Sequence, residues 1–264
     1  IPASTGATTR NRLLRILNLH VVPKRVLSNL TAEGAALTVG GEYIGFKNNT
    51  VFGSGDVDAN QVATISSSKT SKNGRVYYID KMLNFSENLV GAHIEKLGTT
   101  PSAATSQYNY FWEFLKTSTI WNATTKEITG VANGTFFTLF VPNNAAIMNA
   151  VKDGLLPGNT TTGVPNFVQA TQTNLQREQV VRFIYHHFLD KRTIAADGEE
   201  SGSFQTLLKT NLGDPINVFV NNMPGLLVLT DMTGRTANVI SPLSTYIGNR
   251  IVIHLTNNYL KYTL

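Results

Sequence analysis

The sequence contains no cysteine, and this absence removes several kinds of chemistry. Disulfide bonds, thiolate nucleophiles and cysteine-ligated zinc are excluded in a chain of 264 residues without Cys. Charged residues are also scarce, at 15%, against 42% apolar residues. This balance is typical of a packed globular protein and excludes general disorder. The length suits two small domains or one large one.

Long apolar runs are missing as well. No stretch of eighteen apolar residues occurs, so the sequence predicts no transmembrane span. Residues 1–12 lack the apolar segment of a signal peptide. We therefore expect any export signal or lipid anchor to lie upstream of this sequence.

The net charge of +5 is concentrated in the first third of the chain. Residues 1–87 hold ten Lys and Arg against six Asp and Glu, whereas residues 88–264 hold twelve against eleven. A nucleic-acid footprint would be denser and would alternate with stacking aromatic residues. We interpret the excess as a solvated surface and predict no nucleic-acid partner.

Known catalytic and metal-binding motifs are missing too. The five histidines form no His-Glu-x-x-His pattern, and no nucleophile elbow, phosphate loop or dinucleotide fingerprint occurs. Residues 56–60 resemble the start of a calcium loop, but Gln61 and Ser67 replace its required Gly and Glu, which excludes an EF-hand. A turn or another calcium geometry stays open there. We predict no catalytic residue, metal or cofactor.

One pattern occurs twice in the chain. Residues 16–25 and 183–192 each contain an apolar helical stretch that ends in a histidine, followed by apolar residues and a basic turn. We match His20 of the first copy with His186 of the second.

A second pattern also occurs twice, in the same order. Residues 73–83 and 248–255 each place a Gly/Asn turn before a β-branched and aromatic strand, which aligns Val76 with Ile251. Two repeats in the same order indicate duplicated domains.

Short strands and amphipathic helices fill the rest of the chain. Apolar residues at three- and four-residue spacing predict helices from residue 87 to about 115 and on to 128, and a helix entering His186. A strand that ends at Pro142 predicts a helix from about Ala145, capped by Asn143 or Asn144. The predicted strands are 37–39, 42–46, 50–52, 61–65, 204–209, 216–220, 226–230 and 237–240.

These landmarks resemble the fasciclin (FAS1) family. Residues 138–147 are similar to the first conserved segment of that family, Tyr185-His186 to its central Tyr-His pair, and residues 249–255 to its final strand. The first copy has Leu19-His20 in the Tyr-His region and begins too late to contain the first segment.

The resemblance implies an α+β chain with the FAS1 fold, a β-sandwich wedge with helices packed along one edge. It predicts one partial and one complete copy: residues 1–86 as the C-terminal part of a first FAS1 domain, and residues 87–264 as a complete second domain in tandem.

The resemblance also names the candidate binding residues. In the family the Tyr-His pair is linked both to adhesion and to packing, and it maps onto His20, Tyr185 and His186. We favour packing, because a histidine at a helix end can bond a backbone group and order the following turn.

The resemblance implies a non-enzymatic adhesion or matrix-contact module at a cell surface or outside the cell. The lack of cysteine suggests a bacterial protein, with an outer-membrane lipoprotein as one form, whose partner is a protein or a glycan.

Two other functions stay open. One is a glycan-binding module of a bacterial envelope, with the aromatic residues of 108–121 stacking on sugars, although their helical spacing favours core packing. The other is a hydrolase that uses His186 with a carboxylate nearby.

Overall fold

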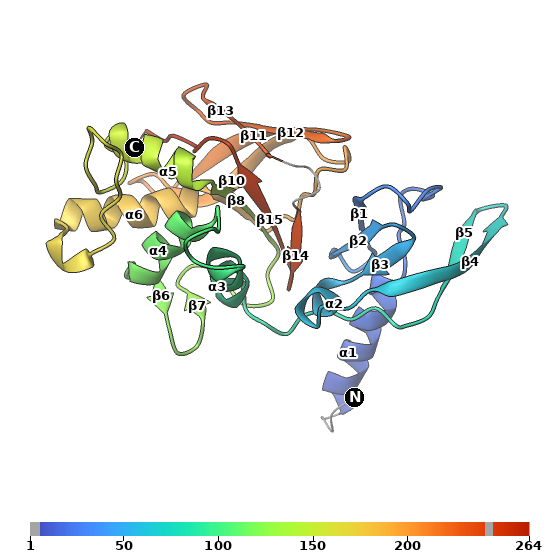
Figure 1. Ribbon diagram of the computed structural model, residues 1–264. Helices are drawn as coiled ribbons and strands as arrows, with labels where there is room; N and C mark the ends of the chain where they lie inside the picture. Colours follow the sequence, from blue (N-terminus) through green and yellow to red (C-terminus); the bar gives the residue numbers. More distant parts are fainter. Residues whose placement is uncertain (1–5, 241–244, 264) are drawn as a thin grey trace. The chain divides into compact units, whose positions relative to one another are not determined.

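The computed structural model describes residues 6–240 and 245–263, and the chain divides into two compact units (Figure 1). Unit 1 comprises Ile1–Glu87 and Ile247–Ile251, and unit 2 comprises Asn88–Tyr246 and Val252–Leu264. Both units combine helices with mainly antiparallel strands, so the fold class is α+β, as predicted.

Unit 1 consists of one long helix, one short helix and a five-stranded antiparallel sheet in the order β1-β2-β3-β4-β5. Its core is formed by apolar residues of the helix, the sheet and the segment that follows the last strand. The elements are α1 (Gly6–Leu19), β1 (Gly34–Leu37), β2 (Tyr43–Lys47), β3 (Thr50–Phe52), α2 (Ser54–Asp58), β4 (Ala63–Ser71) and β5 (Gly74–Ile79).

A two-residue turn sets the register of the first sheet. Asn48 and Asn49 both have positive φ, at 49° and 58°, between the paired residues Lys47 and Thr50. Asparagine tolerates this conformation better than most residues, and two successive positive φ values match the twist of a tight hairpin. The result is the buried pair of Phe46 with Val51.

Unit 2 contains helices that cover an eight-stranded sheet, and a separate two-stranded ribbon. Its helices are α3 (Val90–Thr99), α4 (Asn109–Thr117), α5 (Asn144–Lys152), η1 (Gln169–Thr171) and α6 (Asn174–His186). Within the described ranges 6–240 and 245–263, every helix is too short or too polar to cross a bilayer.

The large sheet has the order β13-β12-β11-β10-β9-β8-β15-β14, and its residues belong to unit 2 except for those within Ile247–Ile251. All six residues of β8 and all six of β15 are buried, which places these two strands in the core. The strands are β8 (Phe137–Pro142), β9 (Phe188–Asp190), β10 (Gly202–Lys209), β11 (Pro215–Met223), β12 (Leu226–Thr230), β13 (Thr236–Asn238), β14 (Tyr246–Gly248) and β15 (Ile251–Thr256), and the ribbon is β6 (Trp121–Asn122) with β7 (Glu127–Ile128).

The predicted strand-to-helix corner is confirmed. Strand β8 ends at Pro142, and the Asn143 side chain accepts the backbone N–H of Ala146 at 2.8 Å. Asn143 is thus the N-cap of α5 and satisfies one of the N–H groups that the first helical turn leaves without a partner.

The helix expected to continue to Ile128 is wrong beyond Thr117. Residues 121–128 form the β6–β7 ribbon, in which the Asn122 side chain accepts the N–H groups of Thr124 and Thr125. Lys126 has a positive φ of 60°, which ends any helical pattern. The aromatic spacing misled the prediction because Trp121 packs edge-to-face on Trp112 from outside the helix, with ring centroids 5.1 Å apart.

The first strand of unit 1 also lies earlier than predicted. Strand β1 covers Gly34–Leu37 rather than residues 37–39. Thr38 donates its backbone N–H to the Glu42 carbonyl, and Gly41 has a φ of 78°, so residues 38–42 form the turn between β1 and β2.

Replacing Asn143 by Ala tests the corner. We expect the free energy of unfolding of unit 2 to fall by about 1 kcal/mol, because the Ala146 N–H loses its capping acceptor. Urea unfolding followed by tryptophan fluorescence measures this unit alone, since Trp112 and Trp121 are the only two tryptophans of the chain.

The matched control is Asn149→Ala in the exposed face of the same helix. It deletes the same amide group and should be neutral or slightly stabilising, because alanine is the better helix former. Equal losses for the two variants would contradict the capping role of Asn143.

Candidate functional site

His20 joins the end of α1 to the segment that follows β5 in unit 1. Its Nδ1 lies 2.8 Å from the Ile16 carbonyl oxygen, and its Nε2 accepts the backbone N–H of Leu83 at 3.1 Å. A carbonyl only accepts and an amide only donates, so these two partners place the ring proton on Nδ1. The imidazole is therefore a two-ended structural link.

His187 makes the same link in unit 2. Its Nδ1 lies 2.7 Å from the Phe183 carbonyl oxygen, four residues earlier in the chain, and its Nε2 accepts the N–H of Leu260 at 3.0 Å. The ring is 1% exposed and packs against Phe183, with centroids 4.3 Å apart. Leu83 and Leu260, which donate to the two histidines, both belong to the buried core of their unit.

These contacts correct the alignment of the repeat by one residue. The counterpart of His20 is His187, not His186, because only His187 makes the matching pair of backbone contacts. The counterpart of His186 is then Leu19, an apolar residue that is equally buried. Tyr185-His186 resembles the family motif in sequence, but the histidine that links the helix end to the last segment is His187.

An aspartate supports the same segment in each unit. The Asp56 carboxylate accepts the N–H groups of Gly53 at 2.8 Å and Asn84 at 3.1 Å. The Asp231 carboxylate accepts the N–H of Lys261 at 2.6 Å. Asn84 and Lys261 directly follow the leucines held by the histidines, so each unit fixes two successive N–H groups.

A third contact repeats at the end of the last strand. The Asp80 side chain accepts the N–H of Thr64 at 2.7 Å, and the Asn257 side chain accepts that of Asn238 at 2.9 Å. Both units also contain the return hydrogen bond between the same residues. Asp80 donates its backbone N–H to the Thr64 carbonyl, and Asn257 donates its backbone N–H to the Asn238 carbonyl.

A fourth contact repeats between the last strand and the segment after the histidine. The Tyr77 hydroxyl donates to the Leu27 carbonyl, and His254 Nε2 lies 2.8 Å from the Ile194 carbonyl oxygen. Residues 20–27 therefore match 187–194 without a gap, and residues 76–84 match 253–261. The sequence alignment matched Val76 with Ile251. The shared contacts show instead that Val76 is equivalent to Ile253.

Burial keeps the histidines of unit 2 neutral. It lowers the pKa of His187 to about 3 and that of His254 to about 4, although a backbone hydrogen bond partly opposes the shift in each case. His254 also stacks on Phe140, with ring centroids 5.3 Å apart and planes 14° apart. These groups stay deprotonated at neutral pH and hold backbone groups in place.

His186 differs from its neighbour. It is 0% exposed, and burial lowers its pKa to about 4, opposed by the charge of Asp231 and the Lys261 backbone. Neither ring nitrogen makes a hydrogen bond of normal geometry within residues 6–240 and 245–263. The ring packs edge-on against Tyr262.

Tyr185 anchors the helix to the loop after the ribbon. Its hydroxyl donates to the Thr129 carbonyl at 2.7 Å, and it lies beside Gly130, where an added Cβ would be 3.0 Å from that hydroxyl. Gly130 has a φ of 84°, a conformation that suits glycine. Of the three candidate binding residues, His20 lies in unit 1, whereas Tyr185 and His186 lie in unit 2 and face different surroundings there.

The aromatic residues considered for sugar stacking lie mostly in the core. Phe111, Trp112 and Phe114 are each at most 3% exposed, and Trp121 packs against Trp112. Burial also raises the pKa of Tyr108 to about 12. Core packing, which the helical spacing favoured, accounts for these side chains.

The segment resembling a calcium loop has structural partners. Asp56 accepts two backbone N–H groups, and Asp58 accepts the hydroxyl of Ser86. Within the residues that the structure describes, no cluster of three or more His, Asp or Glu side chains has the arrangement of a metal site.

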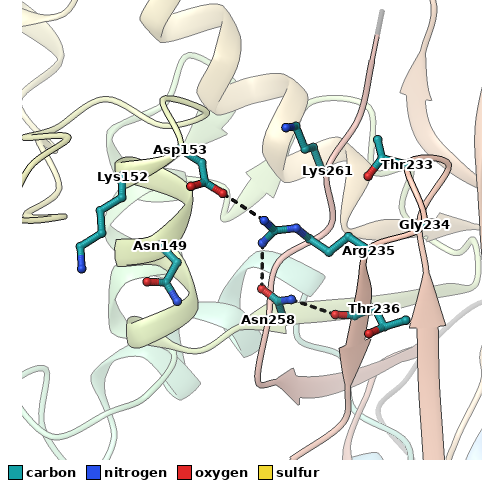
Figure 2. A pocket seen from close by; sticks show the side chains of 9 residues that line it. All are labelled: Asn149, Lys152, Asp153, Thr233, Gly234, Arg235, Thr236, Asn258 and Lys261. Atoms are coloured by element: carbon teal, nitrogen blue, oxygen red, sulfur yellow. Dashed lines mark hydrogen bonds and ion pairs between the residues drawn. The ribbon is translucent and has the colours of Figure 1, made fainter.

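An open polar groove of about 790 Å³ lies on unit 2 beside α5 and the turn before β13 (Figure 2). Arg235 is fixed in it by Asp153 at 3.0 Å and by the Asn258 side chain at 3.1 Å. The guanidinium also lies 4.1 Å from the centre of the Tyr259 ring, whose hydroxyl donates to Asp153.

Two lysines complete the groove. Lys152 and Lys261 line it together with Arg235, against the single carboxylate of Asp153. In Figure 2 the ammonium group of Lys152 points away from the ion pair of Arg235 with Asp153. The groove can offer positive charge and amide groups to a polar ligand, and sequence reasoning missed it because its residues come from distant segments with no shared motif.

Comparison with known proteins gives a match to one family model and similarity to solved structures. Residues 2–85 match the model of the fasciclin domain. A solved structure of a FAS1 domain pair from the insect cell adhesion molecule Fasciclin I is 16% identical, with 96% of this chain and 81% of that chain covered and a TM-score of 0.43. A search of curated protein sequences gave no match.

Replacing each of the adjacent histidines by leucine separates their roles. His187→Leu leaves the Leu260 N–H and the Phe183 carbonyl without partners, and we expect unit 2 to lose about 2–4 kcal/mol of stability. His186→Leu removes a buried imidazole that has no hydrogen bond of normal geometry. It introduces the same residue type that unit 1 has at the equivalent position, Leu19. It should be neutral or stabilising. Urea unfolding followed by tryptophan fluorescence compares the two, and equal losses would refute the alignment of His187 with His20.

The free energy of unfolding of unit 2 should fall as the pH is lowered, at pH values above those at which its carboxylates titrate. The pKa values of His186, His187 and His254 are lowered to about 4, about 3 and about 4, below the usual value of about 6.5 in an unfolded chain. Between pH 6.5 and 5 the unfolded state therefore binds more protons, and the free energy of unfolding falls by up to about 1.4 kcal/mol per pH unit for each histidine.

Unfolding measured by tryptophan fluorescence at pH 7.5, 6.5, 5.8 and 5.0 tests this dependence. Stability should fall only slightly between pH 7.5 and 6.5 and more steeply below pH 6.5. His186→Leu should reduce the slope by the share of one histidine. A stability that stays constant down to pH 5.0, or an unchanged slope in the variant, would contradict the buried neutral state.

Proposed function

On the basis of the fasciclin domain in residues 2–85, we propose that this chain is an adhesion-type module of tandem fasciclin organisation. In this proposal residues 1–86 are the C-terminal part of a first FAS1 domain, and residues 87–264 are a complete second domain. The four contacts that recur in units 1 and 2 support the duplication. The family match is the observation that carries the function.

The structural use of the candidate chemical groups supports a non-enzymatic role. His20, His187 and His254 bind backbone groups, and Asp56 and Asp231 accept backbone N–H groups. A general base must reach a substrate proton. His186 is fully buried without a hydrogen-bonded carboxylate among the described residues, which does not support a hydrolase built on it.

We place the module outside the cell or at its surface, where fasciclin-type contacts with a protein or a matrix component would take place. A bacterial source and a lipoprotein anchor are parts of this proposal and rest on the cysteine-free composition.

A glycan-binding role is the second candidate, and the polar groove of Figure 2 is the observation that favours it. Lysine, arginine and asparagine side chains around a hollow of about 790 Å³ suit hydroxyl or carboxylate groups of a sugar. The burial of Trp112 and the packing of Trp121 on it do not favour this role.

An adhesion assay separates the two candidates. Beads coated with the full chain are expected to adhere to immobilised matrix proteins, collagen and fibronectin, on the order of tenfold above beads coated with heat-denatured chain, because many weak contacts add up on a bead. The same chain on a glycan array should give no signal.

Lys152→Glu with Lys261→Glu reverses the charge of the groove, and Lys69→Glu with Lys72→Glu, at two exposed residues outside the groove, is the matched control. An array signal that the groove variant loses and the control keeps would establish the glycan role. The adhesion proposal fails if native and denatured beads adhere equally.

A further inference from the structure

Unit 1 contains an apolar groove of about 640 Å³ between residues 22–30 and strand β5. Its floor includes Ile44, Phe46 and Val51, which are core residues of the five-stranded sheet. Arg25 and Arg75 lie at its walls. All residues that line it belong to unit 1.

The four repeated contacts identify the position of this groove in the fold. Its walls, residues 22–27 and 76–79, are equivalent to residues 189–194 and 253–256 of unit 2. In unit 2 these segments lie on either side of β8, because the sheet order is β9-β8-β15. The groove of unit 1 is therefore the place that a strand of the β8 type occupies in unit 2.

The backbone of β5 is suited to accept such a strand. The five-stranded sheet ends at β5, whereas its counterpart β15 has β8 and β14 as neighbours. An edge strand presents N–H and C=O groups that can pair with an added strand.

Apolar side chains on α1, at residue 21 and on β5 are exposed in unit 1, whereas their counterparts in unit 2 are buried. Each of five residues that are 45–55% exposed in unit 1 has a counterpart in unit 2 that is at most 8% exposed. The pairs are Leu13 with Val180, Leu17 with Ile184, Val21 with Phe188, Val76 with Ile253 and Tyr78 with Leu255.

Unit 2 also shows what covers these positions. Phe137 of β8 packs edge-on against Phe188, with centroids 6.2 Å apart. The Thr138 hydroxyl donates to the Arg192 carbonyl at 2.8 Å and accepts the Ile194 N–H at 2.9 Å. Strand β8 lies between β9 and β15, and α4 packs on α6, so these two elements adjoin the segments that carry the buried counterparts.

We propose that unit 1 is a strand acceptor whose groove binds an extended apolar segment of the Thr-Leu-Phe-Val-Pro type. The donor is a segment like Thr138–Pro142, from the first conserved segment of a fasciclin domain, and it is supplied by polypeptide outside residues 1–264. It pairs with β5 in the way that β8 adjoins β15 in unit 2. Arg25 and Leu27, the counterparts of Arg192 and Ile194, bind its threonine hydroxyl through their backbone groups. The proposal rests on the repeated contacts and does not require the adhesive role.

Pro23 sets a limit on the pairing. It stands at the position of Asp190, the last residue of β9, which pairs with Phe137. Proline has no N–H to donate, but at the end of a ladder this removes at most one hydrogen bond. The incoming strand should therefore pair mainly with β5.

A synthetic peptide with the sequence of residues 135–143, solubilised by a C-terminal lysine tail and labelled with fluorescein, serves as the donor. It is titrated into the full chain up to about 1 mM, which detects binding down to a free energy of about −4 kcal/mol. Anisotropy measures the affinity, and hydrogen exchange read by mass spectrometry locates the site.

We expect slower exchange at residues 74–79 when the peptide is bound. Exchange in β15 should not change, since β8 already occupies the equivalent position in unit 2. Val76→Asp in the groove should weaken binding at least about tenfold, because it places a charge beside the apolar donor. Val62→Asp, an exposed valine outside the groove lining, should have no effect.

Two control ligands decide whether the groove recognises a strand. A peptide with proline in place of Leu139 keeps the apolar composition but cannot pair along its length. Dodecanoate tests binding of a simple amphiphile. The proposal is overturned if β5 gains no protection at about 1 mM peptide, if the proline peptide binds equally, or if dodecanoate alone protects the groove.

Discussion

The link between an imidazole ring and two backbone groups is the constraint on which both units depend. After β5 and after β15 the chain leaves the sheet and turns into the core, where Leu83 and Leu260 are buried. A buried N–H in such a segment must find an acceptor. His20 and His187 supply it from helix ends, and each ring is fixed by a carbonyl of its own helix. The helix, the last strand and the core are thus held by one rigid side chain.

This constraint explains what sequence reasoning could predict and where it went wrong. Strands β2, β3 and β12 and the corner at Pro142 follow from alternation, turn residues and capping, which act over a few neighbouring residues. The choice between His186 and His187 depends on Leu260, more than seventy residues further along the chain. Adjacent histidines look alike in sequence, and only the contact with the last segment distinguishes them.

The alignment of the last strand failed for a related reason. Arg75 and Arg250 both follow a turn that contains Asn and Gly, so the sequence sets them at the same position. Gly74 already belongs to strand β5, whereas Arg250 has a positive φ of 55° and still belongs to the turn before β15. Turn length is not encoded by composition, and the equivalence of Val76 with Ile253 emerges from the bonds at Asp80 and Asn257. The polar groove of unit 2 could not be predicted at all, because its residues are brought together only by the fold.

The fourth shared contact shows how unit 1 can keep its groove open. In unit 2, His254 reaches the Ile194 carbonyl beside a strand that fills the space between the two segments. In unit 1 the larger Tyr77 makes the equivalent bond to Leu27, and both residues line the groove. This bond fixes the two walls relative to each other without a strand between them. A site whose walls are already held in place loses less conformational entropy when it binds. The same contact that closes the fold of unit 2 therefore prepares unit 1 to receive a partner.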